Sequence, residues 1–269
     1  MKKQGIQKGV YILPNLLTTG NLFFGFFAMI RAINGDFTTA IWALMLSGLF
    51  DFLDGRVARL TRGGSRFGME YDSLVDLCSF GLAPALMMYL WVLHSYKKFG
   101  WMAAFLYFAC TALRLARFNV QAADVEKKSF QGLPSPAAAG CMVTFILMYQ
   151  HLFGLAARPS VTLVIAMTIS LALLMVSNVR YKGFKSLEAK RKTHFFFLVL
   201  ALGFLIVIAA VPEVMLFVVG VCYVSFGVVA EIVGWAQVRS SLETKRPKKG
   251  EFKVIDIGQR GNENKGNGI

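Results

Sequence analysis

The sequence predicts an all-α protein that crosses a membrane several times. Of its 269 residues, 56% are hydrophobic and only 16% are charged, whereas about 25% of residues in soluble domains are charged. The mean hydropathy is +0.55, and apolar stretches long enough to cross a bilayer recur along the chain. Because a helix satisfies its own backbone hydrogen bonds inside a bilayer, each stretch is predicted to be helical.

Eight apolar stretches are candidate membrane-spanning helices. Their approximate ranges are 16–33, 37–60, 69–93, 101–122, 137–155, 161–176, 194–211 and 214–235. Lys and Arg are concentrated in alternate connections, which are the N-terminus, 56–66, 114–128, 180–192 and the C-terminal tail. The positive-inside rule therefore predicts that both termini lie in the cytoplasm.

The chain is predicted to divide into four parts. Residues 1–13 mix apolar residues with lysines and are expected to form an interfacial amphipathic helix that Pro14 ends. Residues 14–180 hold the first six spans, and 181–236 hold the last two. Residues 237–269 are polar, basic and rich in Gly and Asn, which is typical of a disordered tail.

The formal net charge of +14 would suggest a nucleic-acid partner in a soluble protein. Here most Lys and Arg residues flank apolar stretches, where they set topology and meet anionic lipid head groups. We therefore expect membrane lipids as partners and no nucleic acid. The four cysteines lie in or beside apolar stretches without metal-ligand spacing, and they predict no disulfide framework.

Acidic residues are expected to be rare inside membrane spans, because a charge in the membrane interior costs at least ~2.5 kcal/mol. Four aspartates nevertheless stand at the cytoplasmic ends of two consecutive spans. Asp51 and Asp54 are spaced i,i+3 and Asp72 and Asp76 are spaced i,i+4, so each pair lies on one helix face. The short connection from 61 to 67 predicts antiparallel neighbouring helices, with four carboxylates around one space. Such a group repels itself unless it binds a divalent cation, and oxygen ligands suit Mg²⁺ or Mn²⁺.

The residues between the two acidic pairs suit a phosphate-bearing ligand. Gly55, Ala58 and Gly68 keep the helix surface low, so a bulky ligand can approach the backbone. Arg59 offers a cation to phosphate oxygens, and Ser65 offers a hydroxyl. A salt-bridged turn between two helices would explain one Asp–Arg pair but not the whole set. The set therefore predicts a metal–diphosphate site.

The complete string is Asp51-x-x-Asp54-Gly55-x-x-Ala58-Arg59, eight residues, then Gly68-x-x-x-Asp72-x-x-x-Asp76. It resembles the motif of the CDP-alcohol phosphotransferase family at every fixed position. The resemblance implies a six-helix core over 14–180 that binds two divalent metal ions, Mn²⁺ or Mg²⁺, and it implies a homodimer. The last two spans lie outside that core, which gives about eight transmembrane helices in total.

The resemblance also implies roles for single residues. Asp51, Asp54 and Asp72 would bind the metal ions, and Asp76 would both bind one and act as general base. The CDP-linked lipid would contact small and polar residues of the motif and of the first span, namely Asn15, Thr18, Gly55, Ala58, Arg59, Ser65 and Gly68. The implied reaction transfers a phosphatidyl group from CDP-diacylglycerol to an alcohol and releases CMP.

A second region concerns the acceptor alcohol. Span four ends in Arg114-Leu-Ala-Arg117-Phe-Asn119, and Pro134-Ser135-Pro opens span five. Together they resemble the membrane-type phosphatidylserine synthase branch of the family, which implies L-serine as acceptor. Arg114 and Arg117 share a helix face at the depth of the aspartates and are expected to bind the serine carboxylate. Asn119, Pro134 and Ser135 are expected beside them.

Three alternatives stay open at this point. On charge alone, the two arginines could simply snorkel to the interface. A related enzyme would use glycerol phosphate, inositol or inositol phosphate as acceptor. A transporter would also place acids within spans, but nearer the membrane midplane and beside broken helices. The expected location is the cell (inner) membrane, in a multi-pass protein whose active site faces the cytoplasm.

Overall fold

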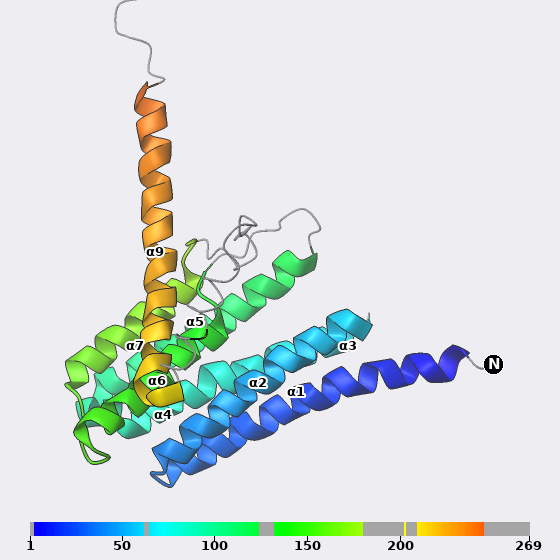
Figure 1. The fold of residues 1–269 in the computed structure, drawn as a ribbon, viewed down its shortest axis with the longest axis horizontal. Coiled ribbons are helices and arrows are strands. Elements are labelled where there is room, and N and C mark those ends of the chain that lie inside the picture. The colour runs from blue at the N-terminus through cyan, green and yellow to red at the C-terminus, as the bar shows by residue number, and fades with distance from the viewer. Residues whose placement is uncertain (1–2, 62–64, 124–131, 180–201, 203–208, 245–269) are drawn as a thin grey trace, which may run out of the picture. The chain divides into compact units, whose positions relative to one another are not determined.

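The computed structural model describes residues 3–61, 65–123, 132–179, 202 and 209–244, and the regular structure in these ranges is helical (Figure 1). The elements are α1 (Lys3–Ile33), α2 (Phe37–Thr61), α3 (Arg66–Asp76), η1 (Leu77–Leu82), α4 (Ala83–Trp91), η2 (Leu93–Tyr96), α5 (Lys97–Ala123), α6 (Ser135–Phe153), α7 (Val161–Val176) and α9 (Pro212–Thr244). Of these, η1 is a π-helical turn and η2 is a 3-10 turn. The predicted all-α class is confirmed.

Among the residues that the structure describes, six helical stretches are long and apolar enough to cross a membrane, so the chain is a multi-pass integral membrane protein. They are Ile12–Ile33, Phe37–Leu60, Arg66–Trp91, Leu93–Gln121, Ser135–Phe153 and Pro212–Glu231. The predicted span at 161–176 forms α7, which has only 16 residues. The predicted span at 194–211 lies outside the described residues except for 202 and 209–211.

The first helix differs from the prediction at Pro14. We expected a break there, but one helix runs from Lys3 through Pro14 to Ile33. Proline removes one backbone donor, and membrane helices tolerate this where neighbouring groups satisfy the freed backbone. The N-terminal segment and the first span are therefore one helix. Its C-terminal counterpart α9 likewise continues to Thr244, into the range predicted to be a tail.

Helices α1, α2 and α3 lie side by side and alternate in direction (Figure 1). Gly35 has a φ of +78° and allows the tight turn between α1 and α2. The Asp36 carboxylate then caps α2 by accepting the backbone N–H of Thr39 (3.1 Å), and it lies 3.7 Å from Arg31. Hydrogen bonds from the side chain and backbone of Thr39 hold the pKa of Asp36 below its usual value.

The third span is a composite helix. The sequence predicts one continuous helix over 69–93, but its middle is the π-helical turn η1, which begins directly after Asp76. The Tyr107 hydroxyl of α5 donates to the carbonyl of Phe80 in this turn (3.1 Å). A Cβ at Gly81 would lie 3.2 Å from the Thr111 side chain, so α5 packs closely here. Such π-helical turns occur frequently at functional sites.

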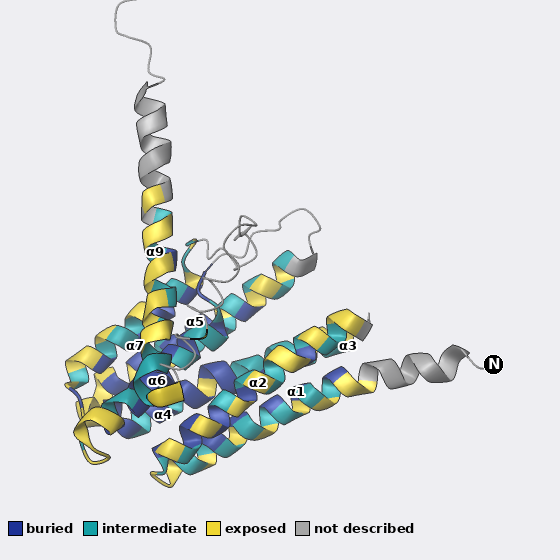
Figure 2. Cartoon of the chain, in the orientation of Figure 1, coloured by how far each residue is buried: buried dark blue, intermediate teal, exposed yellow. Residues whose placement is uncertain are grey.

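Buried residues lie where the helices meet, and exposed residues lie along their outer faces (Figure 2). Trp91, Tyr107 and Met142 are among the largest fully buried side chains. In contrast, Phe23 and Phe26 on α1 are exposed by 60% and 58%. Exposed phenylalanines would be unfavourable in water but suit contact with lipid chains, as expected for membrane-spanning helices.

Candidate active site

Three of the predicted carboxylates form a compact cluster between α2 and α3. Asp51 comes from α2, and Asp72 and Asp76 come from α3. One oxygen from each lies within 4.8 Å of the others. The i,i+4 spacing of Asp72 and Asp76 turns both toward α2, and the short connection after Thr61 returns the chain antiparallel beside it. Three acids from two helices thus share one space.

Two oxygens of this cluster have no hydrogen-bond partner among the described residues. Asp72 Oδ1 and Asp76 Oδ1 are buried from solvent and accept no hydrogen bond. Among the described residues, the ion pairs within 4.0 Å are Arg31–Asp36 and His151–Glu213, so none involves the cluster. Buried carboxylates need a compensating cation, and an all-oxygen ligand set suits a hard divalent ion. The cluster therefore fits a divalent metal.

Asp54, the fourth predicted metal ligand, lies at the edge of the cluster. Its carboxylate accepts a hydrogen bond from the Thr18 hydroxyl of α1 (2.9 Å). It is 5% exposed and lies within electrostatic range of Asp72 and Asp51. The structure thus brings three predicted carboxylates together and holds the fourth beside them through α1. Thr18 was predicted as a lipid contact, and its observed partner is Asp54.

Three further predicted residues meet at the start of α3. The Gly68 N–H donates to the Ser65 hydroxyl (2.9 Å), which caps the helix. A Cβ at Gly68 would lie 3.1 Å from Ser65 Oγ and 3.2 Å from Asn15 Oδ1 of α1. Any side chain at position 68 would crowd both polar groups. Asn15, Ser65 and Gly68 therefore form one small polar surface one turn before Asp72.

The predicted diphosphate residues of α2 follow Asp54 along the helix. Arg59 is exposed, and its Nε donates to the carbonyl of Gly55 (2.8 Å). Ala58 is half-buried. The guanidinium thus folds back along its own helix toward Gly55, one residue beyond Asp54. This turn presents a cation beside a backbone that carries no bulky side chain.

A polar group that the sequence did not single out lies one turn beyond the carboxylates. The Ser47 hydroxyl donates to the Asn21 side-chain oxygen, and Ser79 Oγ lies 3.4 Å from the Asn21 carbonyl. All three residues are buried, and Asn21 Nδ2 has no hydrogen-bond partner. Ser47 precedes Asp51 by four residues and Ser79 follows Asp76 by three. These i,i+4 and i,i+3 spacings place Ser47 and Ser79 on the helix faces that carry the aspartates, and this was the sequence signal that could have identified them.

On the acceptor side, Arg114 of α5 reaches Ser135, the first residue of α6. Its Nη1 donates to the Ser135 hydroxyl (2.8 Å), while its Nε is buried without a partner. Asp76 is the acid that interacts electrostatically with this guanidinium. Arg114 therefore connects the predicted serine-binding residues to the carboxylate cluster, and it retains one donor for a ligand.

Arg117 diverges from Arg114. Its Nη2 donates to the Asn178 side chain (2.9 Å), and its Nη1 donates to the carbonyl of Val176 (3.3 Å) at the end of α7. The i,i+3 spacing predicted a shared face, and the side chains nevertheless turn to different helices. The reason is tertiary: α7 offers Arg117 a carbonyl and an amide oxygen at its C-terminal end, where cations are favoured.

Pro134 belongs to a non-helical entry to α6. The Leu133 N–H donates to the carbonyl of Leu174 (3.1 Å), and the Gly132 N–H to that of Val179 (2.9 Å). Gly132 has a φ of +86°, and a Cβ there would lie 2.2 Å from the Met175 carbonyl oxygen. Only glycine fits this close approach. The entry therefore fixes where α6 and Ser135 begin.

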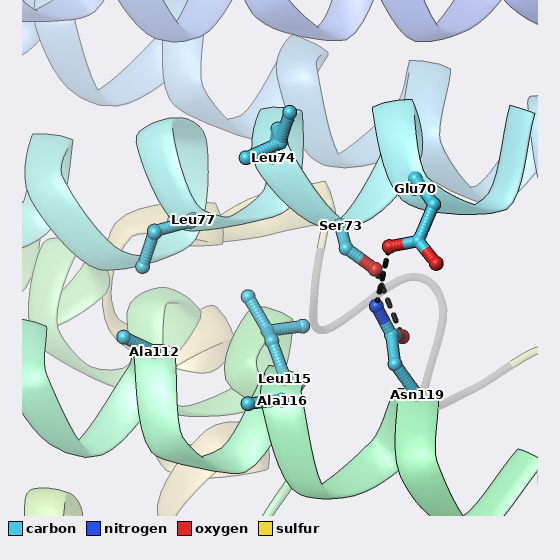
Figure 3. Close-up of a pocket in the computed structure, with 8 residues that line it drawn as sticks. All are labelled: Glu70, Ser73, Leu74, Leu77, Ala112, Leu115, Ala116 and Asn119. Carbon is cyan, nitrogen blue, oxygen red and sulfur yellow. Dashed lines mark hydrogen bonds between the residues drawn. The ribbon is translucent and has the colours of Figure 1, made fainter. Parts of the chain in front are cut away.

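Asn119 lies in a cavity of about 230 Å³ between α3 and α5 (Figure 3). Its amide donates to Glu70 Oε2 (3.3 Å), and its oxygen accepts the Ser73 hydroxyl (3.0 Å). Leu74 and Leu115 are among the apolar residues that line the rest of the cavity. The side chain predicted to bind serine thus bonds to Ser73 and Glu70 of α3, on either side of Asp72 in the sequence.

Comparison with known families places the site in context. Residues 11–176 match the family described as CDP-alcohol phosphatidyltransferase. The matched range contains all four aspartates, Arg114 and Ser135, and it ends before α9.

Relatives with assigned names cover most of the chain. The "CDP-diacylglycerol--serine O-phosphatidyltransferase" of Helicobacter pylori is 36% identical over 223 residues, which are 82% of this chain and 91% of that protein. The protein of the same name from Bacillus subtilis is 30% identical over 178 residues, which are 66% of this chain and 94% of that protein. The "Archaetidylserine synthase" of Methanothermobacter thermautotrophicus is 34% identical over 171 residues, which are 63% of this chain and 69% of that protein.

Proposed function

The chain belongs to the CDP-alcohol phosphatidyltransferase family, and we propose that it transfers the phosphatidyl group of CDP-diacylglycerol to L-serine. The products are phosphatidylserine and CMP. The observation that carries the proposal is the cluster of Asp51, Asp72 and Asp76, whose oxygens converge and form no ion pair within 4.0 Å with a described Lys or Arg. Family membership argues against the transporter alternative, because it gives the carboxylates a role in phosphatidyl transfer.

The family is metal-dependent, and the residues present fit that requirement. We propose that Asp51, Asp54, Asp72 and Asp76 hold two divalent ions, Mg²⁺ or Mn²⁺. Ions bound there supply positive charge to the diphosphate and orient it for displacement. The hydrogen bond from Thr18 fixes the Asp54 carboxylate for this purpose.

The proposed chemistry is a single displacement at phosphorus. The serine hydroxyl oxygen forms a bond to the phosphorus that carries diacylglycerol, and the bond from that phosphorus to the CMP oxygen breaks. CMP leaves with the bonding electrons. Asp76 takes the hydroxyl proton, since it is the carboxylate that interacts electrostatically with Arg114 on the acceptor side. Because its oxygens are held on a rigid helix, positioning contributes more than basicity.

The donor is proposed to lie along the small and polar residues of the first three helices. Asn15, Ser65 and Gly68 offer polar groups at the start of α3, and Arg59 offers its cation. The low surface at Gly55 and Ala58 leaves room for the nucleotide. Thr18 acts on the donor through Asp54.

The acceptor is proposed to bind between α5 and α6. The free Nε of Arg114 would bind the serine carboxylate, with the Ser135 hydroxyl beside it. Pro134 sets the position of Ser135. Arg117 and Asn119, predicted from the sequence as direct contacts, are proposed to support this site from α7 and α3, where their hydrogen bonds lie.

We also propose the cellular arrangement. Alternating loop charge supports an active site on the cytoplasmic side of the cell (inner) membrane, with both termini in the cytoplasm. The family resemblance supports a homodimer. Site-directed labelling of Lys98 and Arg59 replaced by cysteine would test the orientation, because only the latter should react from the cytoplasm.

One assay tests the function directly. Purified protein in detergent micelles is supplied with CDP-diacylglycerol, Mn²⁺ or Mg²⁺ and one alcohol from a panel of serine, glycerol phosphate, inositol and inositol phosphate. We expect CMP release and a phosphatidyl product with serine. Preferred use of another alcohol would reject serine as acceptor but leave the phosphatidyl transfer intact. No CMP release with any alcohol would reject the function.

A further inference from the structure

Helix α9 lies outside the range matched to the family, yet it packs on the helix that carries Ser135. Three contacts define this packing: His151–Glu213 (4.0 Å), the ring pair Phe145–Phe217 (5.4 Å between centroids), and Gly220, where a Cβ would lie 2.8 Å from Cys141 Sγ. Residue numbers rise along α9 as they fall along α6. The two helices are therefore antiparallel, and the next turn of α9 approaches the beginning of α6.

Tyr223 stands on that next turn. It follows Gly220 by three residues, so it shares the face of α9 that meets α6. Its side chain is half-buried and packs against the core, together with Phe217 and Val224. Because the two helices are antiparallel, Tyr223 lies one turn nearer than Gly220 to the start of α6, where Ser135 stands.

Arg114 interacts electrostatically with this phenol. Asp76 and Tyr107 also interact with the guanidinium, but Asp76 belongs to the carboxylate cluster and the Tyr107 hydroxyl donates its proton to the carbonyl of Phe80. Arg114 Nη1 donates to the Ser135 hydroxyl. Tyr223 is a further neutral group, contributed by α9, that can orient the guanidinium without competing with the metal-binding acids.

We propose that Tyr223 is a positioning residue that holds the Arg114 guanidinium toward the serine site, so that the C-terminal span tunes acceptor affinity. The inference rests on the proposed function of Arg114. A phenol oxygen accepts a guanidinium hydrogen bond without adding a charge to the site. The family match ends at residue 176, so Tyr223 lies outside the range that carries the carboxylate cluster. We therefore expect a change in affinity and not a loss of turnover.

The test is a kinetic comparison of the full-length Tyr223→Phe variant with a matched control. Losing one hydrogen bond of the usual net strength should raise the serine KM about three- to tenfold. The kcat and the KM for CDP-diacylglycerol should stay within about twofold, since the ring and its packing remain. Tyr149→Phe makes the same change in a half-buried tyrosine beside Trp91, and it should leave all three constants unchanged.

The same change in an Arg114→Lys background separates the possible failures. If Tyr223 acts through Arg114, Tyr223→Phe should have no further effect on the serine KM in that background. If Arg114→Lys raises the serine KM and Tyr223→Phe does not, the inference is wrong and the proposed function stands. If neither variant changes the serine KM, Arg114 does not bind serine, and both the proposed role of Arg114 and the inference about Tyr223 are wrong. A loss of thermal stability with equal changes for both substrates would show a merely structural role and would also reject the inference.

Discussion

The two sides of the candidate active site are built in different ways. The carboxylate side comes from two consecutive helices joined by one short connection, and its acids converge through helical spacing alone. The acceptor side joins Arg114 of α5 to Ser135 of α6, and we propose that Tyr223 of α9 orients the Arg114 guanidinium. A local motif thus suffices for the chemistry common to a family, whereas the choice of alcohol depends on contacts between distant segments.

The largest expected effect tests the carboxylate side as a whole. Exhaustive treatment with EDTA should reduce CMP release to background, because the buried oxygens of Asp72 and Asp76 then have no cation to bind. Adding back Mg²⁺ or Mn²⁺ should restore turnover. Full activity in EDTA would show that the cluster is not a metal site.

Within that side, Asp76 should differ from Asp51. Asp76→Asn should lower kcat by about 10²- to 10⁴-fold, the range for loss of a general base. Its affinity for CDP-diacylglycerol should fall less than that of Asp51→Asn, which removes a metal ligand without a proton role. Binding and turnover would be measured for both variants. An equal loss of binding in the two would argue against a separate base.

On the acceptor side, Arg114→Lys should act on serine alone. Lysine keeps the charge but loses the fork that can bind Ser135 and a carboxylate at once. Losing a charge-assisted hydrogen bond costs about 1.5–3 kcal/mol, which is about one to two decades in kcat/KM for serine. The KM for CDP-diacylglycerol should not change. Equal changes in the kinetic constants for serine and CDP-diacylglycerol would contradict the separation into a donor side and an acceptor side.

Thr18→Val should have a smaller effect, on the donor side. It removes the hydroxyl that bonds to Asp54 and keeps the shape of the side chain. One hydrogen bond of about 1 kcal/mol predicts about a fivefold weaker affinity for the metal or for CDP-diacylglycerol. Thr168→Val is the control, because this hydroxyl is also buried and donates to the carbonyl of Val164 within its own helix, α7. A change in serine KM alone would contradict the assignment of Thr18 to the donor side.

The smallest expected effect concerns Arg117. Its guanidinium bonds to Asn178 and to the carbonyl of Val176. We therefore expect Arg117→Lys to change the serine KM by less than about threefold. The variant should lower thermal stability, since a hydrogen bond contributes about 1 kcal/mol. Melting temperature and serine kinetics would be measured together. A tenfold rise in serine KM without a change in stability would restore Arg117 as a direct ligand.

The two sides also differ in how far the sequence could predict them. Asp51, Asp72 and Asp76 are predictable because i,i+3 and i,i+4 spacings and a short turn determine which acids meet. The membrane spans are predictable because an apolar stretch of sufficient length has few alternatives in a bilayer.

Tertiary contacts account for what the sequence left undetermined. The same spacing rule placed Arg114 and Arg117 on one face, but partners on α6 and α7 draw them apart. The π-helical turn after Asp76 likewise lies where α5 packs closely, with the Tyr107 hydroxyl bonded to the carbonyl of Phe80. None of these partners is near in sequence, so local patterns carry no signal for them.

The most direct test of the division is a crossed measurement with two variants and two substrates. For Asp51→Asn and Arg114→Lys, the affinity for CDP-diacylglycerol in Mn²⁺ and the serine KM are determined in parallel with the unmodified protein. We predict that Asp51→Asn weakens only donor binding and that Arg114→Lys weakens only serine binding. If each variant alters both substrates to the same extent, the two sides are not separate and the assignment of Arg114 to serine is wrong.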